Sequence, residues 1–126
     1  MANELTITAA FSCIRDIIVV QSSGTKTSTQ NPGTKAAMSQ LSVGTTAGQL
    51  LQASSLGLAS CGYLFVKNTD ANGYVELSMD SGVSSPFTKL LPSEFCLIPV
   101  NKSAAVPNVY AKASVALNVL VCAAEM

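Results

Sequence analysis

The chain has 126 residues, of which 48% are hydrophobic and only 11% charged, and its seven basic and seven acidic side chains cancel to a formal net charge of zero. This length corresponds to one domain that can bury a core without disulfides. The basic residues are spread thinly along the chain, whereas phosphate binding needs clustered lysine and arginine, so no nucleic-acid partner is expected. A neutral surface with little charge suits a protein that packs against copies of itself or against a partner.

No membrane partner is expected either. No stretch reaches the ~18 apolar residues of a membrane-spanning helix, and the opening MANELTITAAF lacks the basic start and apolar run of a signal peptide. The chain is therefore expected to be made in a cytoplasm. Its cysteines, Cys13, Cys61, Cys96 and Cys122, form no CxxC pair and are expected to be small buried hydrophobes. A disulfide framework or a metal cluster is the alternative interpretation.

Hydrophobic residues recur with a period of two from the N-terminus onwards. In ELTITAAFS, Leu5, Ile7 and Phe11 fall on one face, which predicts a half-buried strand. The next run, DIIVVQSS, predicts a short strand covered on both sides. Residues 22–35, SSGTKTSTQNPGTK, have no apolar anchor and predict a long exposed loop, or an arm that orders only on a neighbouring subunit.

Residues 36–60 are ambiguous between helix and strand. The segments AAMSQLSV and AGQLLQAS fit either pattern, and their serine and threonine content favours strand. Residues 62–82, GYLFVKNTDANGYVELSMDSG, predict a β-hairpin whose turn uses Gly73 at positive φ. A pair between Lys67 and Glu76 across that hairpin is plausible.

Four more strands are expected in FTKLL, EFCLIPV, NVYAKAS and VALNVLVCAAE. Pro99 cannot donate a hydrogen bond to a β-ladder, so its strand belongs at a sheet edge or bulge. Eight to ten short strands without intervening helices predict an all-β chain. We expect a single domain over residues 1–126, built as a small antiparallel β-barrel or a jelly-roll-like sandwich, with the loop or arm at 22–35.

The sequence carries no pattern typical of catalysis. The absence of histidine excludes Ser-His-Asp and Cys-His arrangements within the chain. Asp70 and Asp80 occur in turn-like segments, where aspartate commonly binds its own backbone. Tyr63, Tyr74 and Tyr110 are the candidates for sugar binding, and Tyr63 and Tyr74 could share a face of the hairpin. Tyrosines more often serve packing or interfaces. We therefore expect no enzyme, and no catalytic, cofactor or metal site.

The second half of the chain resembles a known group of proteins. The order GYLFVKNTDANGYVEL, PFTKLLPSEFCLIPV and VYAKASVALNVLV is similar to that of small virion structural proteins of tailed bacteriophages, and the opening MANELTITAAFS resembles their N-termini. The resemblance implies a capsid decoration (cement) protein that binds and stabilises the major capsid lattice. It further implies a small homo-oligomer, with a trimer favoured, on the capsid surface of the virion after synthesis in the host cytoplasm.

The contacts with the major capsid protein or between subunits are expected in the N-terminal part. The candidate residues are Leu5, Ile7, Phe11, Thr25, Lys26, Thr27 and Asn31. The three apolar residues among them serve equally well as ordinary core. Two alternative functions stay open: a tail, baseplate or fibre component that binds host glycans, and a shell or tube subunit that assembles by itself.

Overall fold

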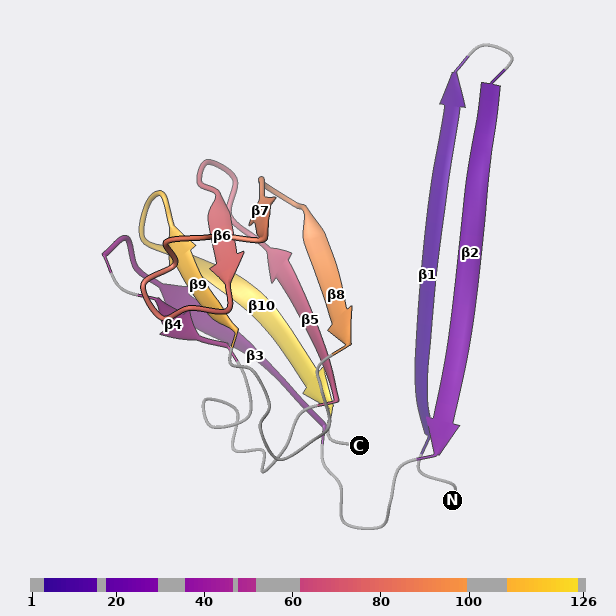
Figure 1. Ribbon diagram of the computed structural model, residues 1–126, viewed down its shortest axis with the longest axis horizontal. Coiled ribbons are helices and arrows are strands. Elements are labelled where there is room, and N and C mark those ends of the chain that lie inside the picture. The colour runs from indigo at the N-terminus through magenta and orange to yellow at the C-terminus, as the bar shows by residue number, and fades with distance from the viewer. Residues whose placement is uncertain are drawn as a thin grey trace. The chain divides into compact units, whose positions relative to one another are not determined.

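The structure is a computed structural model, in which all regular structure is β-strand (Figure 1). The residues that it describes are 4–15, 18–29, 36–46, 48–51, 62–99 and 109–124. They form ten strands in three antiparallel sheets, none of which closes into a barrel within those ranges. The all-β prediction is confirmed. The chain divides into two compact units, Met1–Gly33 and Thr34–Met126, and its first two strands pair with each other.

The first unit is a long antiparallel hairpin of β1 (Glu4–Arg15) and β2 (Ile18–Thr29). Its ladder runs without interruption from the pair Glu4 and Thr29 to the pair Arg15 and Ile18. Residues 22–29, which we predicted to be part of a loop or arm, belong to β2, and residues 30–35 lie outside the described part. This polar segment needs no apolar anchor, because β1 satisfies its backbone and threonine suits a strand.

The second unit contains two four-stranded sheets, called sheet I (order β3-β10-β5-β8) and sheet II (order β4-β9-β6-β7). The strands are β3 Ala36–Val43, β4 Gln49–Leu50, β5 Tyr63–Asn68, β6 Val75–Ser78, β7 Thr88–Leu90, β8 Phe95–Pro99, β9 Tyr110–Ala113 and β10 Leu117–Ala124. All six strands expected in residues 62–124 are present. The ambiguous segment AAMSQLSV is strand β3, whereas residues 52–60 lie outside the described part.

The core of the second unit lies between the two sheets. In sheet I, β5 buries Leu64 and Val66 and leaves Phe65 on the other side, as a period of two requires. In sheet II, β6 buries Val75 and Leu77 in the same way. These residues form one buried cluster with side chains of β3, β7, β9 and β10, which makes the unit sandwich-like. Each fully buried valine or leucine contributes about 1.5–3 kcal/mol.

Residues 62–82 do not form the predicted hairpin. Strand β5 pairs with β10 and β8 in sheet I, and β6 pairs with β9 and β7 in sheet II. The turn between them therefore carries the chain from one sheet to the other. Lys67 and Glu76 lie in different sheets, so the pair expected between them is wrong. Glu76 instead stands opposite Lys89 on β7 and Lys112 on β9.

Two backbone predictions have different outcomes. Pro99 ends β8, an edge strand of sheet I, as predicted. Gly73 does not have the positive φ that we predicted. Glycine is needed there for close packing, because a Cβ would lie 2.6 Å from Cγ2 of Val115 and 2.8 Å from Cδ2 of Leu117.

The cysteines are less buried than expected. Cys13 is exposed on β1, and Cys96 and Cys122 are only half-buried. Cys96 packs against the core from β8, whereas Cys122 alternates with the buried residues of β10 and so lies on the outer face of sheet I. All three are free thiols, and Cys61 lies outside the described residues.

Candidate interaction surface

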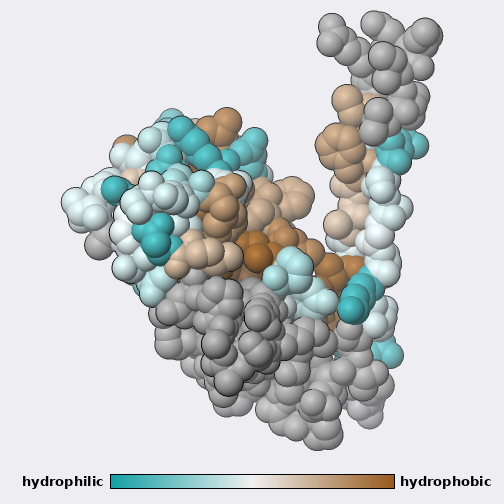
Figure 2. Space-filling view, viewed as in Figure 1, coloured by the Kyte–Doolittle hydropathy of each residue, from teal (hydrophilic) through white to brown (hydrophobic). Residues whose placement is uncertain are grey.

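The hairpin of the first unit has one apolar and one hydroxyl-rich face. Directly opposed residues of an antiparallel pair share a face, so the register assigns each side chain. The hairpin apolar face carries Leu5, Ile7, Ala9, Phe11 and Cys13 from β1. The hairpin hydroxyl face carries Thr6, Thr8, Ser12, Ser23, Thr25 and Thr27. Figure 2 shows the apolar colouring along β1 and the paler, more polar colouring along β2.

Two side-chain hydrogen bonds join β1 and β2 on the hydroxyl face. The Oγ1 atoms of Thr8 and Thr25 are 3.2 Å apart, and Nε2 of Gln21 donates to Oγ of Ser12 at 3.3 Å. Both pairs are exposed, and a net contribution of about 0.5–1.5 kcal/mol is typical of one such bond. They define the local conformation of the hairpin but bury little surface.

Within the first unit, no further strand among the described residues covers the hairpin apolar face. Phe11 is 63% exposed, and Leu5 and Ile7 are only partly covered. The buried cluster contains none of the hairpin side chains that the structure describes, which are those of residues 4–13 and 21–27. An isolated two-stranded hairpin is marginally stable in water. A hairpin this long, with apolar side chains on one face, is therefore suited to lie against another surface.

Six of the seven predicted contact residues lie on this hairpin. Leu5, Ile7 and Phe11 are on its apolar face together with Lys26, which stands opposite Ile7. Thr25 and Thr27 are on the hydroxyl face, so the predicted set does not form one surface. Asn31 lies outside the described residues. Leu5, Ile7 and Phe11 lie outside the buried cluster of the second unit, and both of their expected roles, as contacts and as ordinary core, stay predictions.

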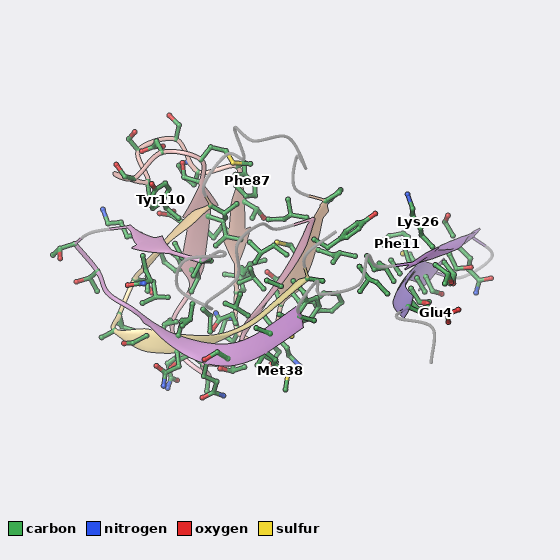
Figure 3. All side chains as sticks on the ribbon, turned by 90° about the horizontal axis from the view of Figure 1, so that it is seen from below. Glu4, Phe11, Lys26, Met38, Phe87 and Tyr110 are labelled. Carbon is green, nitrogen blue, oxygen red and sulfur yellow. The ribbon has the colours of Figure 1, made fainter. Side chains whose placement is uncertain are left out.

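The outer face of sheet I is a second apolar surface, which the sequence analysis missed. The outward-facing residues of its four strands alternate with the core positions. The register places four of them in one row across the sheet: Met38 on β3, Cys122 on β10, Phe65 on β5 and Leu97 on β8. Met38 is 71% exposed, and Figure 3 shows its side chain pointing away from the sandwich. Alternation was visible in each strand, but only the order of the strands joins these residues.

The outer face of sheet II is polar by contrast. Glu76 lies between its cross-strand neighbours Lys89 and Lys112. The Nζ atom of Lys89 is also 3.6 Å from the centre of the Tyr74 ring, a cation–π contact. Tyr74 precedes a strand of sheet II whereas Tyr63 belongs to sheet I, so these two tyrosines do not share the face that we considered for a sugar.

A buried asparagine joins the two sheets at one end. Asn68, the last residue of β5, is fully buried. Its Nδ2 donates to the carbonyl oxygens of Gly73 at 2.8 Å and of Leu90 at 3.1 Å, and its Oδ1 accepts from the backbone N–H of Asp70 at 3.0 Å. Both N–H donors of the Asn68 side-chain amide are thus used inside the protein, so this side chain has a structural role.

Asp70 and Asp80 bind their own turns, as predicted. Backbone N–H groups of Asn72 and Gly73 donate to Oδ1 of Asp70 at 2.7 and 2.8 Å and lower the pKa of its carboxyl group. The hydroxyl of Ser78 donates to Asp80, and this bond is the main cause that holds the pKa of the Asp80 carboxyl group far below its ordinary value. Hydrogen bonds to the ionised form account for both shifts.

No family model, curated protein or solved structure matches the chain. Among the described residues, no three histidine, cysteine, aspartate or glutamate side chains are grouped so that they could hold a metal ion. The described part also contains no helix long and apolar enough to cross a membrane. The two apolar surfaces are therefore the features of the protein that bear on its function.

Proposed function

We propose that the chain is a virion structural protein of the capsid decoration (cement) type, which binds the major capsid protein and stabilises its lattice. The observation that carries the proposal is the exposed β1–β2 hairpin, with twelve residues in each strand. No other described strand of its own unit covers its apolar face, and a partner surface gives that face a function. The low charge of the chain and the resemblance of its second half to phage virion proteins supply the class of partner.

One hairpin face is too small to form a stable interface alone, so the contact requires many copies that bind together. At ~3.4 Å per residue the hairpin extends ~40 Å, and two strands are ~10 Å wide, so one face offers roughly 400 Å². A stable interface buries about 800 Å² per partner. Repetition of the contact over a shell provides the remaining stability through avidity. A decoration protein, which is present in many copies, meets that condition.

We further propose that the second unit is a jelly roll. The support is the strand order, in which β3-β10-β5-β8 faces β4-β9-β6-β7. Two interlocked Greek keys of eight strands produce this order, and viral capsid domains are among the proteins that use it. Because one fold serves many functions, the order supports the role only together with the hairpin.

The proposal is tested by measuring how the purified chain binds to capsids of the major capsid protein that lack it. The variant Phe11→Asp places a charge on the hairpin apolar face, and the matched control Thr6→Asp places the same charge on the hydroxyl face of the same strand. We expect Phe11→Asp to weaken binding at least tenfold, which equals about 1.4 kcal/mol. The control should bind like the wild type. Equal binding of wild type and Phe11→Asp, or no binding of the wild type, would overturn the proposal.

A further inference from the structure

We infer that the outer face of sheet I is the surface through which two copies of this chain associate. This inference rests on the proposed function and deepens it, because it assigns a contact between two copies of the decoration protein to named residues. It concerns the second unit alone, and it is tested on the purified protein without any capsid. Its failure is therefore distinguishable from failure of the hairpin proposal.

The register assembles the surface from all four strands of sheet I. One row across the sheet is Met38, Cys122, Phe65 and Leu97. The next row is Gln40, Leu120, Lys67 and Phe95. The two rows together present six side chains that are apolar or thiol, and they are polar only at Gln40 and Lys67.

The aromatic part of the surface is ordered rather than loose. The rings of Phe65 on β5 and Phe95 on β8 stack with centroids 5.6 Å apart and an interplanar angle of 30°. Phe95 is nevertheless 63% exposed. Offset aromatic pairs of this kind add about 0.5–1.5 kcal/mol beyond burial. The pair thus presents a rigid apolar surface to solvent, and rigid aromatic groups are typical of the centre of an interface.

At one end the apolar surface is bounded by polar residues, as interfaces are at their rim. Beyond the second row the outward positions are Ser42 on β3 and Asn118 on β10, which pair with each other and are exposed. Lys67 stands in the row next to this rim. An antiparallel sheet that faces water normally alternates polar residues on its outer side, as sheet II does, whereas sheet I does so only at this end.

Charge and apolar character favour a second copy of the chain as the occupant. Among its described residues the surface has one cation, Lys67, and no anion, so it offers no charge pattern that a charged partner would complement. Permanent homo-oligomer interfaces are more apolar than contacts between partners that also exist alone. A copy of the chain presents the same apolar rows, and the zero formal net charge of the chain avoids repulsion between copies.

The area suits a weak contact between two copies. Four strands at a spacing of ~4.8 Å are ~19 Å wide, and strands of five to eight residues, as in β8 and β3, are ~17–26 Å long. The projected area is therefore roughly 300–500 Å². Like the hairpin face, this is below the ~800 Å² per partner of a standard interface, so it belongs to the smaller and weaker class of specific contacts. The apolar faces of two copies would then stack like the sheets of a sandwich, ~10 Å apart.

Sedimentation of the purified full-length chain tests the inference. We expect the wild type to sediment as a dimer at micromolar concentration, because a face that pairs with its own copy closes after two subunits. The double variant Met38→Lys/Leu97→Lys places two charges in the central row and should sediment as a monomer with an unchanged far-ultraviolet circular dichroism spectrum. Val115→Lys is the matched control, since Val115 is 47% exposed between β9 and β10, and it should remain oligomeric.

Alkylation of Cys122 gives a second measurement that does not depend on how a variant folds. In the wild type we expect Cys122 to react at least tenfold faster after dilution to the monomer, while the exposed Cys13 reacts equally fast at both concentrations. A wild-type monomer at high concentration would overturn the inference. So would an oligomer that the double variant leaves intact, or a monomer in which Cys122 stays protected by another part of the chain.

Discussion

The side-chain amide of Asn68 donates a hydrogen bond to the carbonyl oxygen of Leu90 at 3.1 Å and thereby joins the end of β5 in sheet I to the end of β7 in sheet II. The backbone of Asn68 is used as well. Its N–H donates to the carbonyl oxygen of Glu94, and its own carbonyl accepts from the N–H of Ser93. The segments NTDANG and KLLPSEF, which carry part of the resemblance to phage proteins, therefore meet at one buried residue.

Asn68→Ala is expected to destabilise the protein by about 2–4 kcal/mol. The change leaves the carbonyl oxygens of Gly73 and Leu90 and the N–H of Asp70 without their partners, and each buried unpaired group costs ~1–3 kcal/mol. Denaturant unfolding measures the difference. Asn118→Ala, at an exposed position of β10, should change the free energy of unfolding by less than about 0.5 kcal/mol. A loss as small for Asn68→Ala as for this control would contradict the role of Asn68.

Gly73→Ala is expected to cost about 1–2 kcal/mol. The new Cβ would meet Cγ2 of Val115 at 2.6 Å and Cδ2 of Leu117 at 2.8 Å, and added volume in a packed site is destabilising. Combining it with Val115→Ala should recover part of the loss, which a double-mutant cycle measures. Gly24→Ala is the control, because a Cβ at Gly24 meets no atom within 4 Å. Equal effects of the two glycine substitutions would show that packing is not the cause.

The sequence predicted the strands better than their partners. The alternation in YVELSM predicts that Val75, Leu77 and Met79 share one face of a strand. Val75 and Leu77 are buried, whereas Met79, which follows the end of β6, is 50% exposed. The pattern is the same whether two successive strands pair in one sheet or face each other across a core. For this reason Lys67 and Glu76 were expected to be neighbours but lie in different sheets. The edge position of Pro99 was predictable, because it follows from the missing backbone N–H of proline and does not depend on which strand pairs with β8.

For the candidate surfaces too, the sequence predicted apolar strand faces but not what those faces contact. Leu5, Ile7 and Phe11 were recognisable as one face, but their sequence could not decide between core and contact, because both need apolar side chains at every second residue. The threonine-rich residues 22–29 were expected to be a loop since nothing apolar anchors them, yet β1 supplies a complete backbone ladder. The outer face of sheet I depends on a strand order, β3-β10-β5-β8, that brings residue 38 next to residue 122.

The stability of the protein is expected to fall in acid through the turn aspartates. The pKa of the Asp80 carboxyl group is lowered in the folded protein from an ordinary value of 3.8, so the unfolded chain binds the proton first as the pH falls. The stabilisation is complete above pH ~4 and is lost as the pH falls towards the folded pKa. Melting temperatures between pH 5 and 2 should therefore decrease less for Asp80→Asn than for the wild type. Parallel profiles would refute this assignment.

Hydrogen exchange should distinguish the hairpin from the sandwich. In the purified protein we expect amides of β1 and β2 to exchange at least a hundredfold faster than those of β5 and β10, because few buried side chains hold the hairpin closed. On a capsid the hairpin amides should become protected, whereas the already slow amides of β5 should not change. Protection of β1 and β2 in the purified protein as strong as that of β10 would contradict the view that the hairpin needs a partner to be held closed.

The copy number of the chain in purified virions, measured by quantitative mass spectrometry against the major capsid protein, tests the central claim most directly. A decoration protein that covers the lattice is predicted to be present at one copy per capsid subunit or at a simple fraction of that ratio. A handful of copies per particle would contradict the claim and favour a tail, baseplate or fibre component. Complete absence from the particle would show that the hairpin serves a partner outside the virion.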